Sequence, residues 1–245
     1  MISTILTTLF QFYNTAFQPI LQLGPYLSMG IFAAALAALF SLFYYIFLDK
    51  EKADRIKEKL NEKQEKMKEA REDDSDEDPG EYMQEMLELN QKFMLTNFKP
   101  MIATIFFVAL IFPWLSATYA PTIGLTPDDP QNTTLNGELN FANQQTPINI
   151  QQQDNTTTIT VDGEEFSEGD QINQYGINWR IGEVQQNPGG LTSTTTEPYT
   201  VQFAAEFIQL PISLPFAGTA LNWLGFYIIL SLPLSITFRK LLGVA

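Results

Sequence analysis

Three long runs of apolar residues, at 27–48, 101–119 and 221–238, alternate with polar stretches along the chain, and none of them contains a charged residue. A helix rises about 1.5 Å per residue, so the first run covers roughly 33 Å, which is enough to cross a bilayer. The other two runs are shorter and contain Pro113 and Pro233, each of which removes a backbone donor and predicts a kink. The pattern therefore predicts three transmembrane helices, the third within a C-terminal segment at 210–245.

The first 24 residues are uncharged but amphipathic. Apolar side chains recur at helical spacing on one face, and Thr and Gln occupy the other. The apolar face holds Ile5, Leu6, Leu9, Phe10, Tyr13 and Phe17, and the polar face holds Thr4, Thr7, Thr8, Gln11, Thr15 and Gln18. A signal peptide is the alternative, but the segment lacks a basic start and a small-residue cleavage site. We predict that residues 1–24 form a helix lying flat on the outer membrane surface.

The stretch 49–99, between the first two apolar runs, is highly charged. In its first half, apolar positions are spaced by four and seven residues among Lys and Glu, as in a coiled coil. An acidic run ending in Pro79-Gly80 interrupts this pattern, and helical spacing resumes at 82–99. We therefore predict an antiparallel coiled-coil hairpin at 49–99, followed directly by the second span.

The stretch 120–209 differs from the rest in being rich in Asn, Gln and Thr. Thr156–Val161 alternates as a half-buried strand does, and Asp162-Gly163 supplies a hairpin turn. Two further strands are expected at 177–184 and 199–207. We interpret this stretch as a small β-rich insertion. Asn132 and Asn155 each begin an Asn-Thr-Thr triplet, which matches the acceptor for N-glycosylation.

The distribution of basic residues indicates an orientation. Of the 14 Lys and Arg residues, all but Arg180 lie within 50–99 or at 239–240. Lys and Arg near spans stay in the cytoplasm, so we predict that the N-terminus is outside and that the hairpin and the C-terminus are inside. The expected fold class is an α-helical protein of the plasma membrane. It has three transmembrane helices, a cytoplasmic coiled-coil hairpin and a small extracellular β-rich insertion.

The composition excludes several kinds of chemistry. The chain contains neither Cys nor His, which removes thiol nucleophiles, imidazole bases and the usual ligands of zinc and haem. It also lacks a recognisable nucleophile–base pair or phosphate-binding loop. The net charge of −14 argues against sequence-specific binding of nucleic acid. We expect no enzymatic activity, no metal and no cofactor.

Two groups of side chains are candidates for contacts with other membrane proteins. Flexible Met residues suit surfaces that accept many apolar partners, although some must also pack inside the hairpin. This candidate capture set is Met67, Met83, Met86, Phe93, Met94, Phe98 and Met101. Polar groups in the cytoplasmic halves of the spans serve either as interhelical contacts or as the lining of a partly hydrated groove. This candidate groove set is Ser41, Tyr45, Asn97, Lys99, Thr104, Ser231 and Ser235.

The order of these segments, Lys99-Pro100-Met101 at the start of the second span and the terminal segment 221–243 carry a family resemblance. The chain resembles the archaeal integral membrane proteins grouped as the domain of unknown function 106 family, within the YidC/Oxa/Alb insertase superfamily. Eukaryotic relatives include the insertase subunit of the endoplasmic-reticulum membrane protein complex and a receptor for tail-anchored proteins. The resemblance covers 1–118 and 210–245 and leaves 120–209 without a counterpart.

This resemblance implies a protein that inserts client membrane segments without nucleotide hydrolysis. The spans would form a groove open to cytoplasm and lipid, and the Met-rich hairpin would receive nascent or tail-anchored clients. Bacterial relatives commonly place an Arg inside the groove, whereas here Lys99 is the nearest basic residue. Ribosomes, a targeting factor and a translocon are candidate partners besides the lipid bilayer. The competing hypotheses are a receptor that recruits a ribosome or targeting factor through the hairpin, and an extracellular binding module at 120–209.

Overall fold

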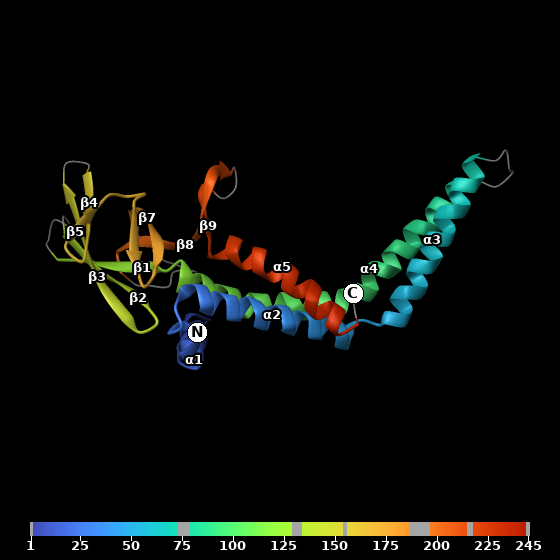
Figure 1. Ribbon diagram of the computed structural model, residues 1–245, viewed down its shortest axis with the longest axis horizontal. Coiled ribbons are helices and arrows are strands. Elements are labelled where there is room, and N and C mark those ends of the chain that lie inside the picture. Colours follow the sequence, from blue (N-terminus) through green and yellow to red (C-terminus); the bar gives the residue numbers. More distant parts are fainter. Residues whose placement is uncertain are drawn as a thin grey trace. The chain divides into compact units, whose positions relative to one another are not determined.

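The computed structural model describes residues 2–72, 79–128, 134–153, 156–186, 197–214 and 218–243 (Figure 1). These residues form two compact units. The first comprises Met1–Ala35 and Leu110–Leu232, and the second comprises Leu36–Ala109 and Pro233–Ala245. Because three helices continue from one unit into the other, each unit contains one part of every long apolar helix. The two units are described separately below.

Five helices account for the segments with helical spacing. They are α1 (Ile2–Leu21), α2 (Pro25–Phe47), α3 (Lys50–Glu72), α4 (Pro79–Tyr119) and α5 (Trp223–Leu241). Among the residues that the structure describes, three stretches are long and apolar enough to cross a membrane, namely Pro25–Phe47, Phe98–Tyr119 and Trp223–Leu241. These stretches coincide with the three predicted spans. The helix α4 is 41 residues long and contains Pro100 and Pro113, so the second half of the hairpin and the second span are one helix.

In the first unit, α1 packs against α2 and the end of α4 around one buried tryptophan. The Trp114 side chain is 1% exposed, and its indole N–H donates to Asn14 Oδ1 at 2.7 Å. Phe17 and Phe32 lie 5.2 and 5.4 Å from the Trp114 ring, measured between ring centroids. A buried indole N–H needs an acceptor, and Asn14 supplies it from the polar side of α1. The contact attaches α1 to the ends of two spans.

The remainder of the first unit is an antiparallel sheet, and the expectation of a small β-rich insertion is wrong. In the described residues the sheet has nine strands, with the path β5-β4-β3-β2-β1-β8-β7-β6 and with β9 paired to β8. The strands are β1 (Thr122–Pro127), β2 (Thr134–Phe141), β3 (Gln144–Gln153), β4 (Thr156–Val161), β5 (Glu164–Phe166), β6 (Gln171–Gln174), β7 (Ile177–Gln186), β8 (Tyr199–Leu214) and β9 (Gly218–Asn222). The sheet is thus a large domain with a core of its own.

Alternation of buried and exposed residues explains why so polar a stretch folds as a sheet. One face of the strands is apolar, and Asn, Gln and Thr populate the other, as expected for a sheet with one buried face. The buried side chains include Leu135, Leu139, Phe141, Ile148, Ile150, Ile159, Val161, Ile177, Trp179, Ile181, Val201 and Phe203. Few apolar residues are needed per strand because every second residue faces outward.

Three two-residue turns set the register of the hairpins. Both turn residues have positive φ in Ala142-Asn143 (53° and 66°), Asp162-Gly163 (50° and 84°) and Tyr175-Gly176 (59° and 81°). Positive φ at both positions is the geometry whose twist matches that of the flanking strands. The predicted turn at Asp162-Gly163 is confirmed by the pairing of Val161 with Glu164. The other two turns, Ala142-Asn143 and Tyr175-Gly176, have sequences that predict a hairpin turn less strongly than Asp-Gly does.

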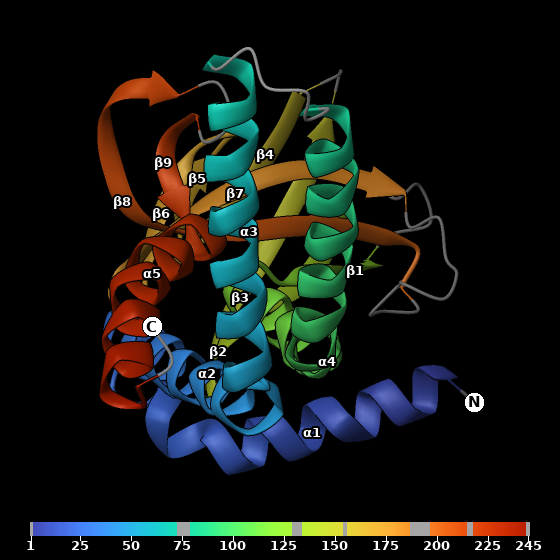
Figure 2. The same ribbon diagram turned by 90° about the vertical axis from the view of Figure 1, so that its right-hand side faces the viewer.

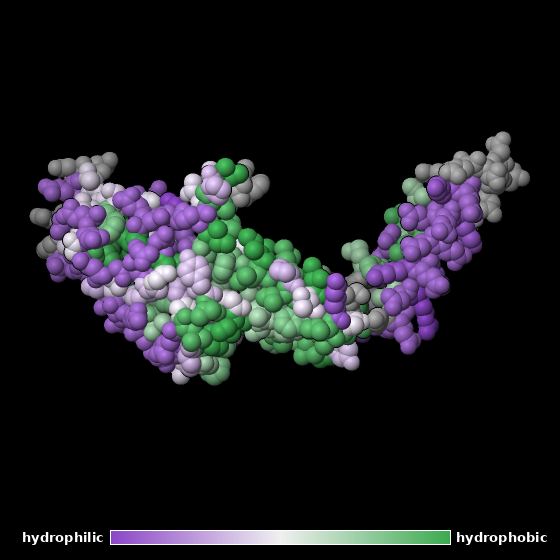
Figure 3. All heavy atoms as spheres, in the orientation of Figure 1, coloured by the Kyte–Doolittle hydropathy of each residue, from purple (hydrophilic) through white to green (hydrophobic). Residues whose placement is uncertain are grey.

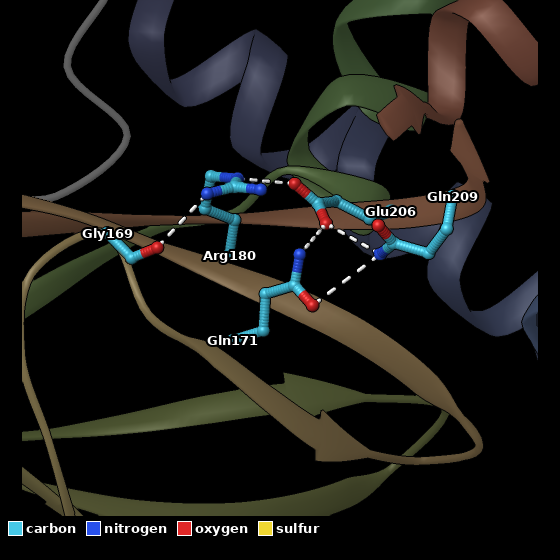
Figure 4. A network of polar contacts seen from close by, with 5 residues as sticks. All are labelled: Gly169, Gln171, Arg180, Glu206 and Gln209. Carbon is cyan, nitrogen blue, oxygen red and sulfur yellow. Dashed lines mark hydrogen bonds and ion pairs between the residues drawn. The ribbon is translucent and has the colours of Figure 1, made fainter. Parts of the chain in front are cut away.

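A buried carboxylate connects three of the strands (Figure 4). Glu206 of β8 is only 7% exposed, and its Oε1 accepts a hydrogen bond from Arg180 Nε of β7. Its Oε2 accepts hydrogen bonds from Gln171 Nε2 of β6 at 2.5 Å and from Gln209 Nε2 at 3.1 Å. Arg180 Nη1 also donates to the Gly169 carbonyl at 3.1 Å. Arg180, the one basic residue remote from the hairpin and the C-terminus, is therefore structural.

We expect Arg180→Ala to destabilise the β6–β8 part of the sheet by about 2–3 kcal/mol, because Glu206 would remain buried without its counter-charge. Hydrogen exchange of the backbone amides of β6–β8, measured on the full chain in detergent, reports this local loss. The double variant Arg180→Ala/Glu206→Ala should recover part of the protection, since it removes both charges together. Unchanged exchange in the Arg180→Ala variant would contradict this interpretation.

Candidate functional site

The second unit carries a continuous stripe of exposed apolar side chains along α4. The stripe consists of Met83, Leu87, Met94, Phe98, Met101 and Ile105, which are between 42% and 71% exposed. With 3.6 residues per turn, these six positions fall within an arc of about 60° on the helix. The stripe begins in the charged hairpin and ends inside the second span without a gap of more than seven residues. We call it the α4 stripe.

The helices α3 and α4 lie side by side (Figure 2), and the α4 residues that contact α3 lie on a different face from the exposed α4 stripe. Lys63 of α3 forms an ion pair with Glu85, and its ammonium nitrogen lies 5.3 Å from the centroid of the Tyr82 ring. Lys57 approaches the ring of Phe93 to 5.9 Å in the same way. Contacts between a cation and an aromatic face of this kind stabilise a partly exposed helix pair. The Lys57 and Lys63 side chains of α3 therefore stabilise the packing of α3 against α4.

The outer surfaces of the helix pair carry exposed ion pairs within each helix. Lys66 Nζ lies 2.9 Å from Glu62 Oε1, and Lys92 Nζ lies 2.8 Å from Glu88 Oε1. The hydrogen bond and the positive charge of each Lys lower the pKa of its Glu below the ordinary value. These exposed carboxylates stay ionised near neutral pH and keep the pair hydrophilic. In Figure 3, hydrophobic side chains lie along one side of this otherwise hydrophilic pair.

The seven residues of the candidate capture set fall on two faces. Met83, Met94, Phe98 and Met101 belong to the α4 stripe, whereas Met86 and Phe93 are half-buried on other faces of α4. Met67 is half-buried on α3. Leu87 and Ile105 are absent from the candidate capture set, although they lie four or seven residues from Met83, Met94 or Met101 in the sequence. Selecting residues by type rather than by helical face caused this omission.

The polar residues of the candidate groove set mostly bond within their own helices. The hydroxyls of Ser41, Thr104 and Ser231 donate to the carbonyls of Ala37, Pro100 and Ile228 at 2.7, 3.0 and 3.2 Å. Such bonds to the preceding turn satisfy a hydroxyl inside a membrane helix without a partner helix. Tyr45 and Lys99 are exposed and Ser235 is half-buried, whereas the side chain of Asn97 lies outside the described residues, as do Asn132 and Asn155. A groove lined by this set stays a prediction.

Arg239, in the last turn of α5, packs against α2. Its guanidinium carbon lies 4.2 Å from the centroid of the Tyr44 ring. A guanidinium over an aromatic face is attracted by the ring electrons, most strongly where water is partly excluded. From the sequence, the positive charge of Arg239 indicated only that the C-terminus is on the cytoplasmic side. The structure shows that it also joins the ends of the first and third spans.

The first unit contains a cleft of about 1120 Å³ between α1, the end of α4 and strands β1–β4, with both polar and apolar side chains in its lining. Its lining includes the carboxylates of Glu138, Asp162 and Glu197 and no Lys or Arg. None of the residues of the candidate capture set or the candidate groove set lines it. Across the described part of the chain, no three Asp or Glu side chains are arranged to hold a metal ion. The cleft forms where segments distant in the sequence meet, so no local sequence pattern predicts it.

These elements define a multi-pass membrane protein with three candidate spans and a long helical hairpin between the first two. The family model for EMC3/TMCO1-like integral membrane proteins matches residues 13–146, which is more than half of the chain, and the protein belongs to this family. The family is related to the YidC/Oxa1/Alb3 insertase superfamily and is associated with membrane protein insertion. A search of curated proteins found no match, and neither did a search of solved structures.

Proposed function

We propose that this protein is an insertase that accepts apolar client segments on the α4 stripe and passes them into the bilayer. The observation that carries the proposal is the continuity of the stripe from Met83, in the charged hairpin, to Ile105, in the second span. Covering one such side chain fully contributes roughly 1.5–3 kcal/mol. A client helix contacting several of them is held without a rigid pocket, and Met residues suit clients of different sequence.

The route that we propose lowers the cost of moving a client into lipid. A polar client terminus in hydrocarbon costs several kcal/mol for each unsatisfied group. Along the α4 stripe the apolar part of the client stays covered from the hairpin to the membrane. The polar terminus would cross beside Ser41, Thr104 and Ser235, where α4 contains Pro100 and Pro113 and where α5 contains Pro233 and is only 19 residues long.

In the proposed orientation the hairpin lies in the cytoplasm and the β sheet lies outside, because the basic residues flank the spans on the hairpin side. Candidate clients are nascent or tail-anchored membrane proteins, delivered by a ribosome or a targeting factor. A translocon is a further candidate partner. The finer assignment to the archaeal branch of the superfamily, and to the plasma membrane, is part of the same proposal.

Reconstitution tests this function directly. The purified protein is placed in lipid vesicles and supplied with a single-span client that has a short polar tail, and tail protection from added protease measures insertion. We expect protection to exceed that in protein-free vesicles. Equal protection in both kinds of vesicle would refute the insertase proposal. Vesicles that contain an unrelated three-span protein are the control for general bilayer disturbance.

The alternative is a receptor whose hairpin recruits a ribosome or targeting factor while the spans act as an anchor. The exposed charges of α3 and of the first half of α4 favour this reading, since they provide a docking surface for a soluble partner. Deleting Glu58–Met86 separates the two functions. A receptor loses all activity, whereas an insertase retains activity on clients supplied directly, because Met94, Phe98, Met101 and Ile105 remain.

A further inference from the structure

We propose that the β8–β9 hairpin is a second membrane-surface element, which rests on the lipid headgroup region through its exposed residues Pro211–Ser213 and Gly218–Thr219. The proposed contact is with lipid rather than with another protein. It is independent of the insertase function and concerns how the sheet is held against the bilayer. Four observations carry it.

The first observation is the direct connection of β9 to the third span. Strand β9 ends at Asn222 and α5 begins at Trp223, with no linker between them. The Asn222 side-chain oxygen accepts the Gly225 N–H at 3.0 Å, which is the bond that starts a helix sharply. The β9 strand therefore ends at the place where the span begins.

The second observation concerns the length of that span. The helix α5 has 19 residues, or about 28 Å, which is barely the thickness of the hydrocarbon core. Arg239 and Lys240 occupy its last turn and must lie at the opposite boundary. Because α5 is just long enough to cross the hydrocarbon core, its first turn lies at the other membrane boundary. The end of β9 lies at that boundary too.

The third observation is a cluster of aromatic side chains that holds β8 at the same level. Tyr26, in the first turn of α2, donates its hydroxyl to the Phe207 carbonyl at 3.1 Å. The Phe207 ring stacks on Phe226 of α5 with 4.7 Å between the ring centroids. Aromatic side chains with a polar end collect at membrane–water boundaries. The second half of β8 leaves this cluster at the level where both spans begin.

The fourth observation is the composition and direction of the hairpin. No charged residue occurs between Glu206 and Arg239, and Ile212 is 66% exposed. Figures 1 and 2 show the hairpin leaving the first turn of α5 across the direction of that helix, as α1 also lies across it. Figure 3 shows hydrophobic residues at the base of the hairpin, continuous with those of α5. An uncharged, partly apolar element that lies along a membrane boundary has lipid as its neighbour.

The absence of cysteine allows a test on the intact protein. Single variants Ile212→Cys, Ile229→Cys and Glu183→Cys are labelled with an environment-sensitive fluorophore and reconstituted in phosphatidylcholine vesicles. The lipids carry bromine either near the glycerol end or near the tip of the acyl chain, and bromine quenches nearby fluorophores. Ile229 is exposed on the span and reports lipid, whereas Glu183 is exposed on β7 and reports water.

We expect the label at position 212 to lose fluorescence in the vesicles with shallow bromine, and more than in those with deep bromine. The label at position 229 should be quenched in both, and the label at position 183 in neither. If position 212 behaves as position 183 does, the hairpin stands in water and the proposal is overturned. Emission at position 212 that is shifted to the blue but unquenched by either lipid would show a protein surface, and this too would overturn it.

Discussion

Replacing three residues of the α4 stripe with glutamine, as Met83→Gln/Leu87→Gln/Met94→Gln, is expected to reduce client insertion by about 30- to 100-fold. Glutamine is close to Met in length and favours helices equally, so the hairpin should keep its fold. Each substitution removes about 1 kcal/mol of apolar contact with a client, and a loss of 2–3 kcal/mol corresponds to this range. The initial rate of client protection in reconstituted vesicles, at a client concentration below saturation, measures the effect.

The matched control for this prediction keeps the apolar surface and changes only its chemistry. In the Met83→Leu/Met94→Leu variant we expect insertion to remain within about twofold, because leucine is apolar and a strong helix former. Circular dichroism of both variants in detergent checks that helical content is unchanged. Normal insertion by the glutamine variant would show that clients do not bind the α4 stripe. The insertase route would then have to lie elsewhere on the spans.

The largest expected effect on stability is that of Trp114→Ala, which should lower the free energy of unfolding by about 3–5 kcal/mol. The substitution leaves a cavity among Phe17, Phe32 and the end of α4, where Trp114 is 1% exposed. It also removes the donor that Asn14 uses to attach α1. Thermal unfolding of the detergent-solubilised chain, followed by circular dichroism, measures the loss.

Two milder variants separate packing from hydrogen bonding at this position. Trp114→Phe keeps an aromatic ring but loses the indole N–H, and Asn14→Ala removes the acceptor while leaving the ring. We expect each to cost only about 1–2 kcal/mol, because Asn14 is exposed and water replaces part of the lost bond. Equal losses for Trp114→Ala and Trp114→Phe would mean that the hydrogen bond, and not the packing, holds α1.

The helices could be predicted from the sequence because their signal is local. The spacing of apolar residues in 2–21 matches α1, and the uncharged runs at 27–48, 101–119 and 221–238 overlap α2, α4 and α5, although Leu221 and Asn222 belong to β9. The sequence also predicted that the hairpin leads directly into the second span, and the structure has the two as one helix that continues through Pro100. A proline lacks its own donor but does not by itself end a helix whose neighbouring turns are well packed, and Pro100 is buried.

The sheet was underestimated because its polar strands carry a weak local signal. Strands β2 and β3 contain Asn, Gln, Pro and Gly, which are uncommon in strands, and only alternate residues such as Leu135 and Leu139 mark the buried face. Their turn, Ala142-Asn143, adopts positive φ although alanine rarely does. Pairing with other strands stabilises these segments. A pattern within a few residues of sequence cannot predict this pairing.

The candidate site was predictable in kind but not in arrangement. Residue types pointed to Met83, Met94, Phe98 and Met101, and the structure places them on one exposed face. Hydroxyl groups such as Ser41 and Thr104 could be identified, but their hydrogen bonds to their own helices could not. The cleft whose lining includes Glu138, Asp162 and Glu197 depends on how α1, the end of α4 and the sheet come together. Of these three features, only the cleft depends on tertiary neighbours, which a single sequence does not display. The stripe and the hydroxyl bonds follow from the local geometry of a helix.

The order of strands in the sheet has a consequence for how this protein can be altered. Strand β1, which follows the second span, pairs along Thr122–Leu125 with β8, which leads through β9 to the third span. The domain thus begins on β1 and ends on β9, which both pair with β8, so its removal would leave a gap short enough for a modest loop. The sheet is a detachable module in this sense. Shortened or exchanged domains could be grafted between the same two helices, which would separate what the membrane part does alone from what the sheet adds.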